Sequence, residues 1–270
     1  MAPRIKLLII DPEDDFCKPD GALSVKDADK DMSRLAKMVK RILSHIRDIH
    51  ITQDAHHSFD VAHPPFWRNV SNKHPDPFTI ISADDVERGI WTPSVRSLRD
   101  KMLSYVRALE ASARYPLCIW PEHCLIGSPG MNIVADLFAA VSMWEQEKAG
   151  AIVDYVTKGS NPFTEHYSAV KAEVPDPKDL STQINTGLIE TLKEADLILC
   201  AGEAGSHCLA NTVRDIAEEF GDDYVKKLML IEDATSPVPG FETQQDEFIH
   251  EMVGRQMQTT TTDKFDPRKI

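Results

Sequence analysis

The 270-residue sequence begins without the long hydrophobic run that a signal peptide or a membrane-spanning helix requires. Its first residues, MAPRIKLLIIDPEDD, hold only four consecutive apolar positions, residues 7–10, before an acidic cluster. We therefore expect neither a cleaved leader nor a membrane anchor.

Cysteine and positive charge are also scarce. The five cysteines form no C-x-x-C pair, and their odd number leaves at least one thiol unpaired, so free thiols in a reducing compartment are expected. The chain has 30 Lys and Arg against 43 Asp and Glu, a net charge of −13. This excess of acid argues against nucleic acid or an anionic membrane as partner. A cytoplasmic protein is predicted.

Internal repeats, low-complexity segments and an interior linker are missing as well. The hydrophobic content of 42% and the charged content of 27% are typical of a soluble globular protein. We predict a single domain over residues 1–257, with a long proline-rich loop at about 57–93, and a loose polar tail over 258–270.

Short apolar segments alternate six times with segments whose apolar residues recur at helical spacing. The predicted strands are residues 5–10, 49–52, 115–120, 151–157, 197–200 and 228–231. This alternation predicts an α/β fold of three layers, a mostly parallel six-stranded sheet with helices on both faces, Rossmann-like in its arrangement. In such a fold, functional side chains gather at the carboxyl ends of the strands.

One stretch, LILCAGEAGSHCLANTVRDIA at 197–217, combines a buried strand, a turn of small residues and a helix. Cys208 stands at the start of that helix, where the helix dipole and free N–H groups favour a thiolate. The small residues let the backbone approach a ligand. The alternative is a buried, inert structural cysteine.

Asp11, Lys158 and Cys208 each follow a predicted strand, so a parallel sheet would bring them to one edge. A carboxylate beside a thiol takes its proton and later returns it to a leaving amine. A neighbouring lysine lowers the thiol pKa, and turn N–H groups hold the oxyanion. The set suits attack on an amide carbonyl through a thioester. Structural roles for Asp11 and a solvated Lys158 are the alternatives.

Asp54 and His56 form a second pair, because residues i and i+2 of an extended chain point to the same side. A third ligand would complete a site of two histidines and one carboxylate for a metal. We expect His123, at the end of the third predicted strand, because a strand end positions a ligand rigidly. Two histidines of the long loop, which cost more entropy to order, are the alternatives: His63 and His74.

Five segments match, in order, the pattern of a known family: LLIIDPEDDFCKPDGAL, ITQDAH, WPEHCLIGSPG, TKGSNPFTEHYSA and GEAGSHCLANTVRDI. They extend from Ile5 to about Ala234. On these segments the sequence resembles the nicotinamidases of the isochorismatase-like cysteine hydrolase superfamily, and this resemblance implies the isochorismatase-like fold.

The resemblance also implies roles for individual residues. It implies a catalytic triad of Asp11, Lys158 and Cys208. It implies metal ligands at Asp54, His56 and His123. It implies a cis peptide between Glu203 and Ala204, and an oxyanion hole made by the N–H groups of Ala204 and Cys208. The aromatic walls around the substrate ring would be Phe16 and Trp67.

Three features depart from the family pattern: Ala55 stands in place of a tryptophan, Glu203 in place of an apolar residue, and the loop at 57–93 is long. We expect a metal-assisted cysteine amidohydrolase that converts nicotinamide and water to nicotinate and ammonia, in NAD salvage and pyridine nucleotide metabolism. The alternatives are a hydrolase of another small amide, of the N-carbamoyl or pyrazinamide type, and a non-catalytic binding protein on this fold.

The expected cofactor is a divalent metal. Zinc is the first choice of metal, and Mn and Fe are the alternatives. The expected partner is a small-molecule amide substrate, with no nucleic acid and no membrane, and a homo-oligomer is left open.

Overall fold

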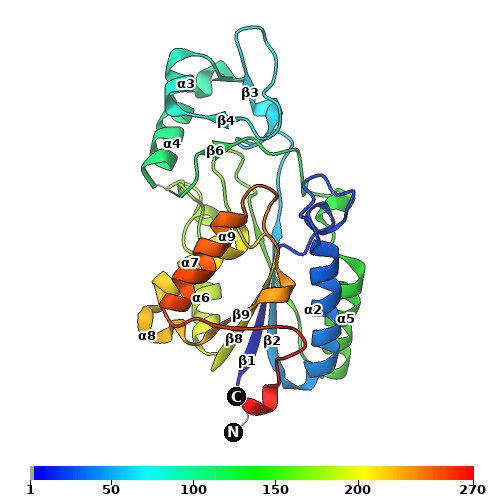
Figure 1. Cartoon of the computed structure of the whole chain (residues 1–270). Helices are drawn as coiled ribbons and strands as arrows, with labels where there is room; N and C mark the ends of the chain where they lie inside the picture. The colour runs from blue at the N-terminus through cyan, green and yellow to red at the C-terminus, as the bar shows by residue number, and fades with distance from the viewer. Residues whose placement is uncertain (1–2, 113) are drawn as a thin grey trace.

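A central sheet of six strands organises the computed structural model, which describes residues 3–112 and 114–270 (Figure 1). The strand order is β10-β9-β8-β1-β2-β7, and every neighbouring pair is parallel. The strands are β1 (Ile5–Ile10), β2 (Ile46–Asp54), β7 (Asp154–Lys158), β8 (Leu197–Gly202), β9 (Leu228–Ile231) and β10 (Gln258–Thr260). The predicted α/β class with a parallel six-stranded sheet is confirmed.

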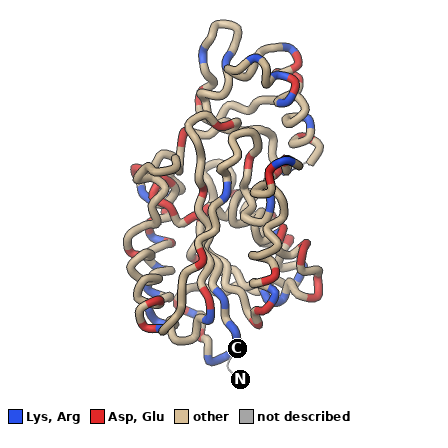
Figure 2. The backbone as a smooth tube through the Cα atoms, turned by 180° about the vertical axis from the view of Figure 1, so that it is seen from behind, with Lys and Arg blue, Asp and Glu red and all other residues tan. Residues whose placement is uncertain are grey.

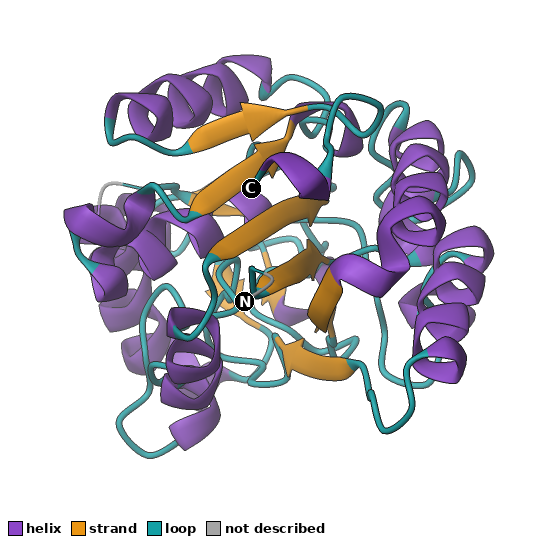
Figure 3. Ribbon diagram, turned by 90° about the horizontal axis from the view of Figure 1, so that it is seen from below, coloured by secondary structure: helices purple, strands orange, loops and turns teal. Residues whose placement is uncertain are grey.

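Helices cover both faces of this sheet (Figures 1 and 3). The helices of one face, which pack against each other, are α2 (Ala28–Ile42) and α5 (Ala135–Glu147). The helices of the other face are α6 (Thr186–Lys193), α7 (Cys208–Phe220), the short α8 (Asp222–Val225) and α9 (Glu242–Gly254). Because a parallel sheet covered in this way has neither face exposed to solvent, β1 and β8 are buried along their whole length and are apolar apart from Lys6 of β1.

The order of the strands creates a crevice at the middle of the sheet. β2 and β7 lie on one side of β1, whereas β8, β9 and β10 lie on the other. The chain therefore leaves β1 and β8 toward opposite faces, and a crevice forms outside the carboxyl ends of these two strands. Asp11 follows β1 and Cys208 begins the helix after β8, so the topology delivers both to this crevice.

A smaller lobe stands beyond the carboxyl ends of the sheet, at the top of Figure 1. It contains β3 (Trp67–Arg68), β4 (Ile80–Ile81), α3 (Ala83–Arg88), β5 (Thr92–Pro93), α4 (Arg99–Ser112) and β6 (Leu117–Cys118). Two antiparallel pairs, β3–β5 and β4–β6, and a separate apolar cluster around Phe66 and Trp67 hold it together. The segment expected to be a loop therefore has short elements and a core of its own.

The membership of the central sheet differs from the prediction in one strand. The predicted strand at 115–120 is β6, which pairs with β4 in the lobe. An apolar run shows burial but not which sheet buries it, so the sequence could not make this distinction. The sixth central strand is instead β10, at the sheet edge beside β9.

The tail over 258–270 is accordingly not loose. Besides β10, it places Phe265 in the main core and ends with a helical turn, Pro267–Lys269. Edge strand β10 reads Gln-Thr-Thr and is largely exposed, so it carries no apolar signal. The assignment of residues 1–257 to one domain stays a prediction.

Short helical turns join the larger elements. They are α1 (Asp14–Cys17) and the 3-10 turns Leu43–His45, Pro64–Phe66, Arg96–Leu98, Pro129–Met131, Leu180–Thr182 and Glu232–Ala234.

Acidic and basic residues are interspersed over the side of the molecule seen in Figure 2. None of the helices within residues 3–112 and 114–270 has the length and apolar character needed to cross a membrane.

Candidate active site and metal centre

Lys158 lies among side chains that come from three different strand ends. Its Nζ is 2.9 Å from Asp11 Oδ2, 3.1 Å from Asp54 Oδ1 and 3.6 Å from Cys208 Sγ. It also donates to the carbonyl oxygen of His166 at 3.0 Å. All of these side chains are buried. The structure thus brings the predicted triad together, while the catalytic role of each residue stays a prediction.

Two glycines allow the strand ends to come this close. Gly202, the last residue of β8, has a φ of 111°, and a Cβ there would lie 2.0 Å from the carbonyl oxygen of Ile10. Gly159 has a φ of 81°, and a Cβ there would lie 2.6 Å from Asp54 Oδ1. A side chain at either position would force the strand ends or Asp54 apart.

Burial decides the protonation of the nucleophile. It raises the pKa of the Cys208 thiol well above its usual range, although the charge of Lys158 acts in the opposite direction. Burial also opposes the charge of Lys158, but Asp11 and Asp54 outweigh it and raise the lysine pKa. Burial therefore outweighs the effect expected of the helix start on the thiol pKa. The thiol is protonated at neutral pH and must lose its proton to a base.

Asp11 is placed to be that base. One of its carboxylate oxygens lies within 4.8 Å of Cys208 Sγ, and the hydroxyl of Thr52 donates to Oδ1. Burial raises the pKa of Asp11, against the opposing charge of Lys158. A buried carboxyl with a raised pKa holds a proton more readily than an exposed one does, which suits a group that takes a proton and returns it.

Asp54, His56 and His123 form a compact group of ligand atoms. These atoms lie within 4.8 Å of one another, and all three residues are buried. His56 Nε2 is 3.1 Å from Asp54 Oδ1, and His123 Nε2 is 3.8 Å from Asp54 Oδ2. Burial opposes the charge of Asp54, but His56 and Lys158 hold its pKa well below the usual range. An ionised carboxylate and two imidazoles fit a divalent metal.

The other ring nitrogen of each histidine already has a partner. His56 Nδ1 lies 3.2 Å from Asp60 Oδ2, and His123 Nδ1 lies 2.8 Å from the carbonyl oxygen of Pro121. Within the described chain, His56 Nε2 is buried without a hydrogen bond. Partners at Nδ1 orient a ligating ring and leave Nε2 for the metal, so the hydrogen bonds of His56 and His123 to Asp60 and Pro121 also fit the predicted metal site.

His123 reaches the site by a route that differs from the expected one. It does not extend a central strand. The segment after β6 instead lies beside the extension of β2, where His56 and Leu125 form a parallel bridge. The backbone N–H of His56 donates to the carbonyl oxygen of Cys124 at 3.1 Å, and the backbone N–H of Ile126 donates to the carbonyl oxygen of His56 at 3.0 Å. Backbone pairing outside the sheet therefore positions this ligand.

The two alternative histidines are not in the ligand group found among the described residues. His63 lies behind His123, with Nε2 3.3 Å from His123 Nδ1, and so supports the ring without joining the group. His74 binds the carbonyl oxygen of Trp67 at 2.8 Å, in the lobe.

A narrow cavity adjoins Cys208. Its volume of about 30 Å³ is small. The lining consists of Phe16, Leu23, Asp54, Trp120, His123, Glu165, Tyr167, Ala204, His207, Cys208 and Val238. The predicted nucleophile and two predicted metal ligands thus share one cavity.

The aromatic walls differ from those expected. Phe16 lines the cavity and meets the His123 ring edge-on, with centroids 5.3 Å apart. Trp67 does not line it: the ring is fully buried in the lobe, where Nε1 donates to the Val61 carbonyl at 2.7 Å. Assigning Trp67 to the substrate wall was wrong. Trp120 lines the cavity instead, and the W-P-x-H-C segment that carries His123 also contains it.

The turn before α7 has the geometry that the resemblance implied. The Glu203–Ala204 peptide is cis, and both Ala204 and Cys208 line the cavity. Their oxyanion-hole role stays a prediction. Glu203 itself is fully buried.

Sequence reasoning missed two polar residues of the lining. Burial, together with Asp60 and Asp54, raises the pKa of Glu165 to about 8, and burial lowers the pKa of His207 to about 3. Both shifts favour the neutral form of the side chain. Glu165 lies within TKGSNPFTEHYSA and His207 precedes Cys208, so both were in motifs that already pointed to the site.

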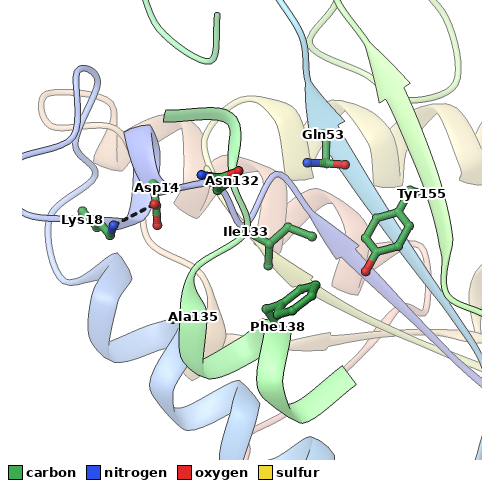
Figure 4. Close-up of a pocket in the computed structure, with 8 residues that line it drawn as sticks. All are labelled: Asp14, Lys18, Gln53, Asn132, Ile133, Ala135, Phe138 and Tyr155. Carbon is green, nitrogen blue, oxygen red and sulfur yellow. Dashed lines mark hydrogen bonds and ion pairs between the residues drawn. The ribbon is translucent and has the colours of Figure 1, made fainter. Parts of the chain in front are cut away.

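A larger hollow, of about 590 Å³, lies elsewhere, against edge strand β7. Figure 4 shows Phe138 and Tyr155 close to each other beside Ile133, with the Asp14–Lys18 ion pair at the other end. The predicted catalytic and metal residues do not line this hollow. Size alone therefore does not identify the reactive site.

Comparison with known proteins gives no match to a protein-family model and none to a curated protein sequence. Solved structures do match. A nicotinamidase and pyrazinamidase from Acinetobacter baumanii has a TM-score of 0.64 at 18% identity, with 97% of this chain and 98% of that chain covered. The yeast nicotinamidase has a TM-score of 0.66 at 17% identity, with 95% and 99% covered.

A third match is the pyrazinamidase of Pyrococcus horikoshii in complex with zinc, with a TM-score of 0.58, 17% identity, and 96% and 99% of the two chains covered. The chain therefore has the isochorismatase-like α/β fold. The solved proteins named here that share this fold are nicotinamidases and pyrazinamidases.

Proposed function

We propose that this protein is a metal-assisted cysteine amidohydrolase, with nicotinamide as the first substrate to test. The observation that carries the proposal is the arrangement of Asp11 and Cys208 around the Lys158 ammonium, beside a cavity that two candidate metal ligands also line. The fold shared with solved nicotinamidases supports it.

The reaction begins with proton transfer from the Cys208 thiol to Asp11. The sulfur attacks the amide carbonyl carbon, and the N–H groups of Ala204 and Cys208 hold the oxyanion that forms. The C–N bond then breaks as Asp11 returns the proton to the departing ammonia, which leaves a thioester. Asp11 next takes a proton from water, whose oxygen attacks the thioester; the C–S bond breaks, the carboxylic acid leaves, and Asp11 returns the proton to the Cys208 sulfur.

Lys158 holds the charges of this sequence in balance. Its ammonium lies between Asp11 and Asp54, so it lowers the cost of keeping the Asp11 carboxylate in a buried site. Asp54, His56 and His123 would hold the divalent metal, zinc first, which would supply a coordination position for a pyridine nitrogen and so orient the ring. Zinc in the Pyrococcus horikoshii structure supports this choice.

The test is ammonia release from nicotinamide, pyrazinamide and a set of N-carbamoyl amides, with and without a chelator. We expect turnover of the pyridine and pyrazine amides that falls when the metal is removed. Turnover of N-carbamoyl amides alone, unaffected by chelator, would contradict the metal-assisted assignment.

A second candidate is hydrolysis of another small amide. Glu165 and His207 add polar groups to the lining, and Ala55 leaves out a tryptophan of the family pattern. These groups bear on which amide binds and leave the chemistry at Cys208 unchanged. A non-catalytic role on the same fold would give no ammonia from any amide in the set. For the first candidate, we place the enzyme in the cytoplasm, in the salvage of pyridine nucleotides.

A further inference from the structure

Two carboxyl groups meet beneath the turn that carries Ala204. Glu203 follows β8 and is 0% exposed, and Asp31, on α2, is 2% exposed. Both accept hydrogen bonds from Ser236, Glu203 Oε2 from its N–H at 3.0 Å and Asp31 Oδ2 from its hydroxyl at 2.6 Å, so the two carboxyl groups lie close together. Two ionised carboxylates held this close in a buried site would repel each other, so the two acids share one proton.

The other contacts show which acid carries the proton. Asp31 accepts from Ser236 Oγ at 2.6 Å and from the Arg34 guanidinium, and both donors favour its ionised form. Glu203 Oε2 accepts from the Ser236 N–H at 3.0 Å, while Oε1 has no donor within the described chain. Glu203 is therefore the acid that carries the shared proton.

The remaining titratable neighbours do not change this assignment. The buried Cys17 thiol of α1 is the further ionisable group near Glu203. The Arg34 guanidinium forms ion pairs with both Asp31 and Asp233. Its Nε also donates to the Asp233 carbonyl oxygen at 2.7 Å. Arg34 is thus the nearby cation, and it contacts Asp31, which is the acid that we assign as ionised.

The same acid pair is tied to the backbone of the predicted oxyanion hole. The Glu203 N–H donates to the Ile10 carbonyl at 2.8 Å, at the end of β1. The Gly205 N–H donates to the Ser236 carbonyl at 2.9 Å. Glu203 is thus held by its main chain to the strand of Asp11 and by its side chain to Ser236 and α2. These contacts fix the orientation of the peptide that presents the Ala204 N–H.

The wall of the cavity is fixed by the same segment. The Val238 N–H donates to Ser206 Oγ at 3.0 Å, and Val238 lines the cavity. Ser236 thus contacts both acids, and its carbonyl oxygen accepts from the turn. Val238, in the same segment, forms part of the cavity wall. An apolar residue at 203, as in the family pattern, would leave the Ser236 N–H without this acceptor.

We infer that Glu203, through a proton shared with Asp31, is a positioning residue that fixes the Ala204 N–H for stabilising the oxyanion. The inference rests on the proposed function for its kinetic part. Its structural part, the shared proton, is independent of any substrate.

The shared proton is tested by thermal unfolding of wild type and Glu203→Gln over a range from about pH 5 to about pH 9. A carboxyl that stays protonated in the folded state stabilises it fully below the pKa of the unfolded chain, and this contribution is lost as pH rises through the folded pKa. Glutamine accepts from the Ser236 N–H in the same place without titrating. The Tm of Glu203→Gln minus that of wild type should therefore rise with pH, whereas a constant difference would overturn the shared proton.

The positioning role is tested by kinetics of Glu203→Gln and Glu203→Leu. Leucine cannot accept from the Ser236 N–H, and misplacement of a catalytic group by about 1 Å costs about 100-fold. We expect kcat of Glu203→Leu to fall by about that factor with a smaller change in KM, because the oxyanion forms only after binding. Glutamine should restore most of kcat.

Glu173→Gln is the matched control, because Glu173 is a buried acid paired with Arg114 away from the cavity, and its kcat should stay near that of wild type. If Glu203→Leu does not fold, Asp31→Ala removes the other half of the pair and should lower kcat in the same way. A folded Glu203→Leu or Asp31→Ala variant with kcat within about threefold of wild type would overturn the positioning role. If wild type hydrolyses no amide, the proposed function fails, and the thermal comparison still decides the shared proton.

Discussion

Cys208 combines a raised thiol pKa with a position on the cavity wall. Cys208→Ala should abolish amide hydrolysis and leave the fold intact, because it removes the thiol that we propose forms the thioester. Iodoacetamide, followed by mass spectrometry, should label Cys208 before the other cysteines, and faster as pH rises, because the thiol is protonated at neutral pH.

Cys200→Ala is the control, since Cys200 is buried within β8 and its pKa is raised to about 12. It should retain activity and the labelling of Cys208. Near-normal turnover by Cys208→Ala would show that the mechanism is wrong.

Asp11→Asn keeps the size of the side chain but cannot accept the thiol proton. Loss of a general base typically costs about 10²–10⁴-fold, so we expect kcat to fall by that order. Asp14→Asn is the matched control: Asp14 is three residues away and pairs with Lys18 at the other hollow, at 2.7 Å. If Asp11→Asn loses less than about threefold, Asp11 has a structural role instead.

At the scale of elements, the C-terminal segment belongs to the core. Phe265, which follows the edge strand β10 in the chain, is 3% exposed within the main apolar cluster. Phe265→Ala should lower the free energy of unfolding by about 3 kcal/mol, because a buried ring is replaced by a cavity. Ile270→Ala, at a half-exposed position of the same segment, should change it by less than about 0.5 kcal/mol. Equal effects in urea titrations would contradict the packing described here.

The elements also show which sequence signals were sufficient. β1 and β8 were predictable because a run of apolar residues is long enough to bury a strand on both faces. β6 had the same signal but joined the lobe, and β10 had no apolar signal because it lies at an exposed edge. Local pattern thus reports burial, whereas the partner of a strand depends on contacts distant in sequence.

For the whole molecule, metal binding should raise stability, because a ligand that binds only the folded state contributes about 2.7 kcal/mol at 100 times its dissociation constant. Removal of metal by a chelator should lower Tm, and zinc should restore it.

His123→Ala should lose the metal in elemental analysis, and its Tm should no longer respond to chelator. His74→Ala should behave like wild type, because His74 binds a backbone carbonyl in the lobe. Full metal content in His123→Ala would contradict this ligand assignment.

The sequence by itself determined the α/β class, the strand ends that carry Asp11, Lys158 and Cys208, and the Asp54–His56 pair. These follow from local periodicity and from the rule that parallel strands share a carboxyl edge. Only the tertiary structure decided that Trp120 rather than Trp67 lines the cavity, that burial keeps the Cys208 thiol protonated, and that Glu203 meets Asp31. Each of these depends on which distant segments pack together, and desolvation and shared protons arise only once that packing excludes water.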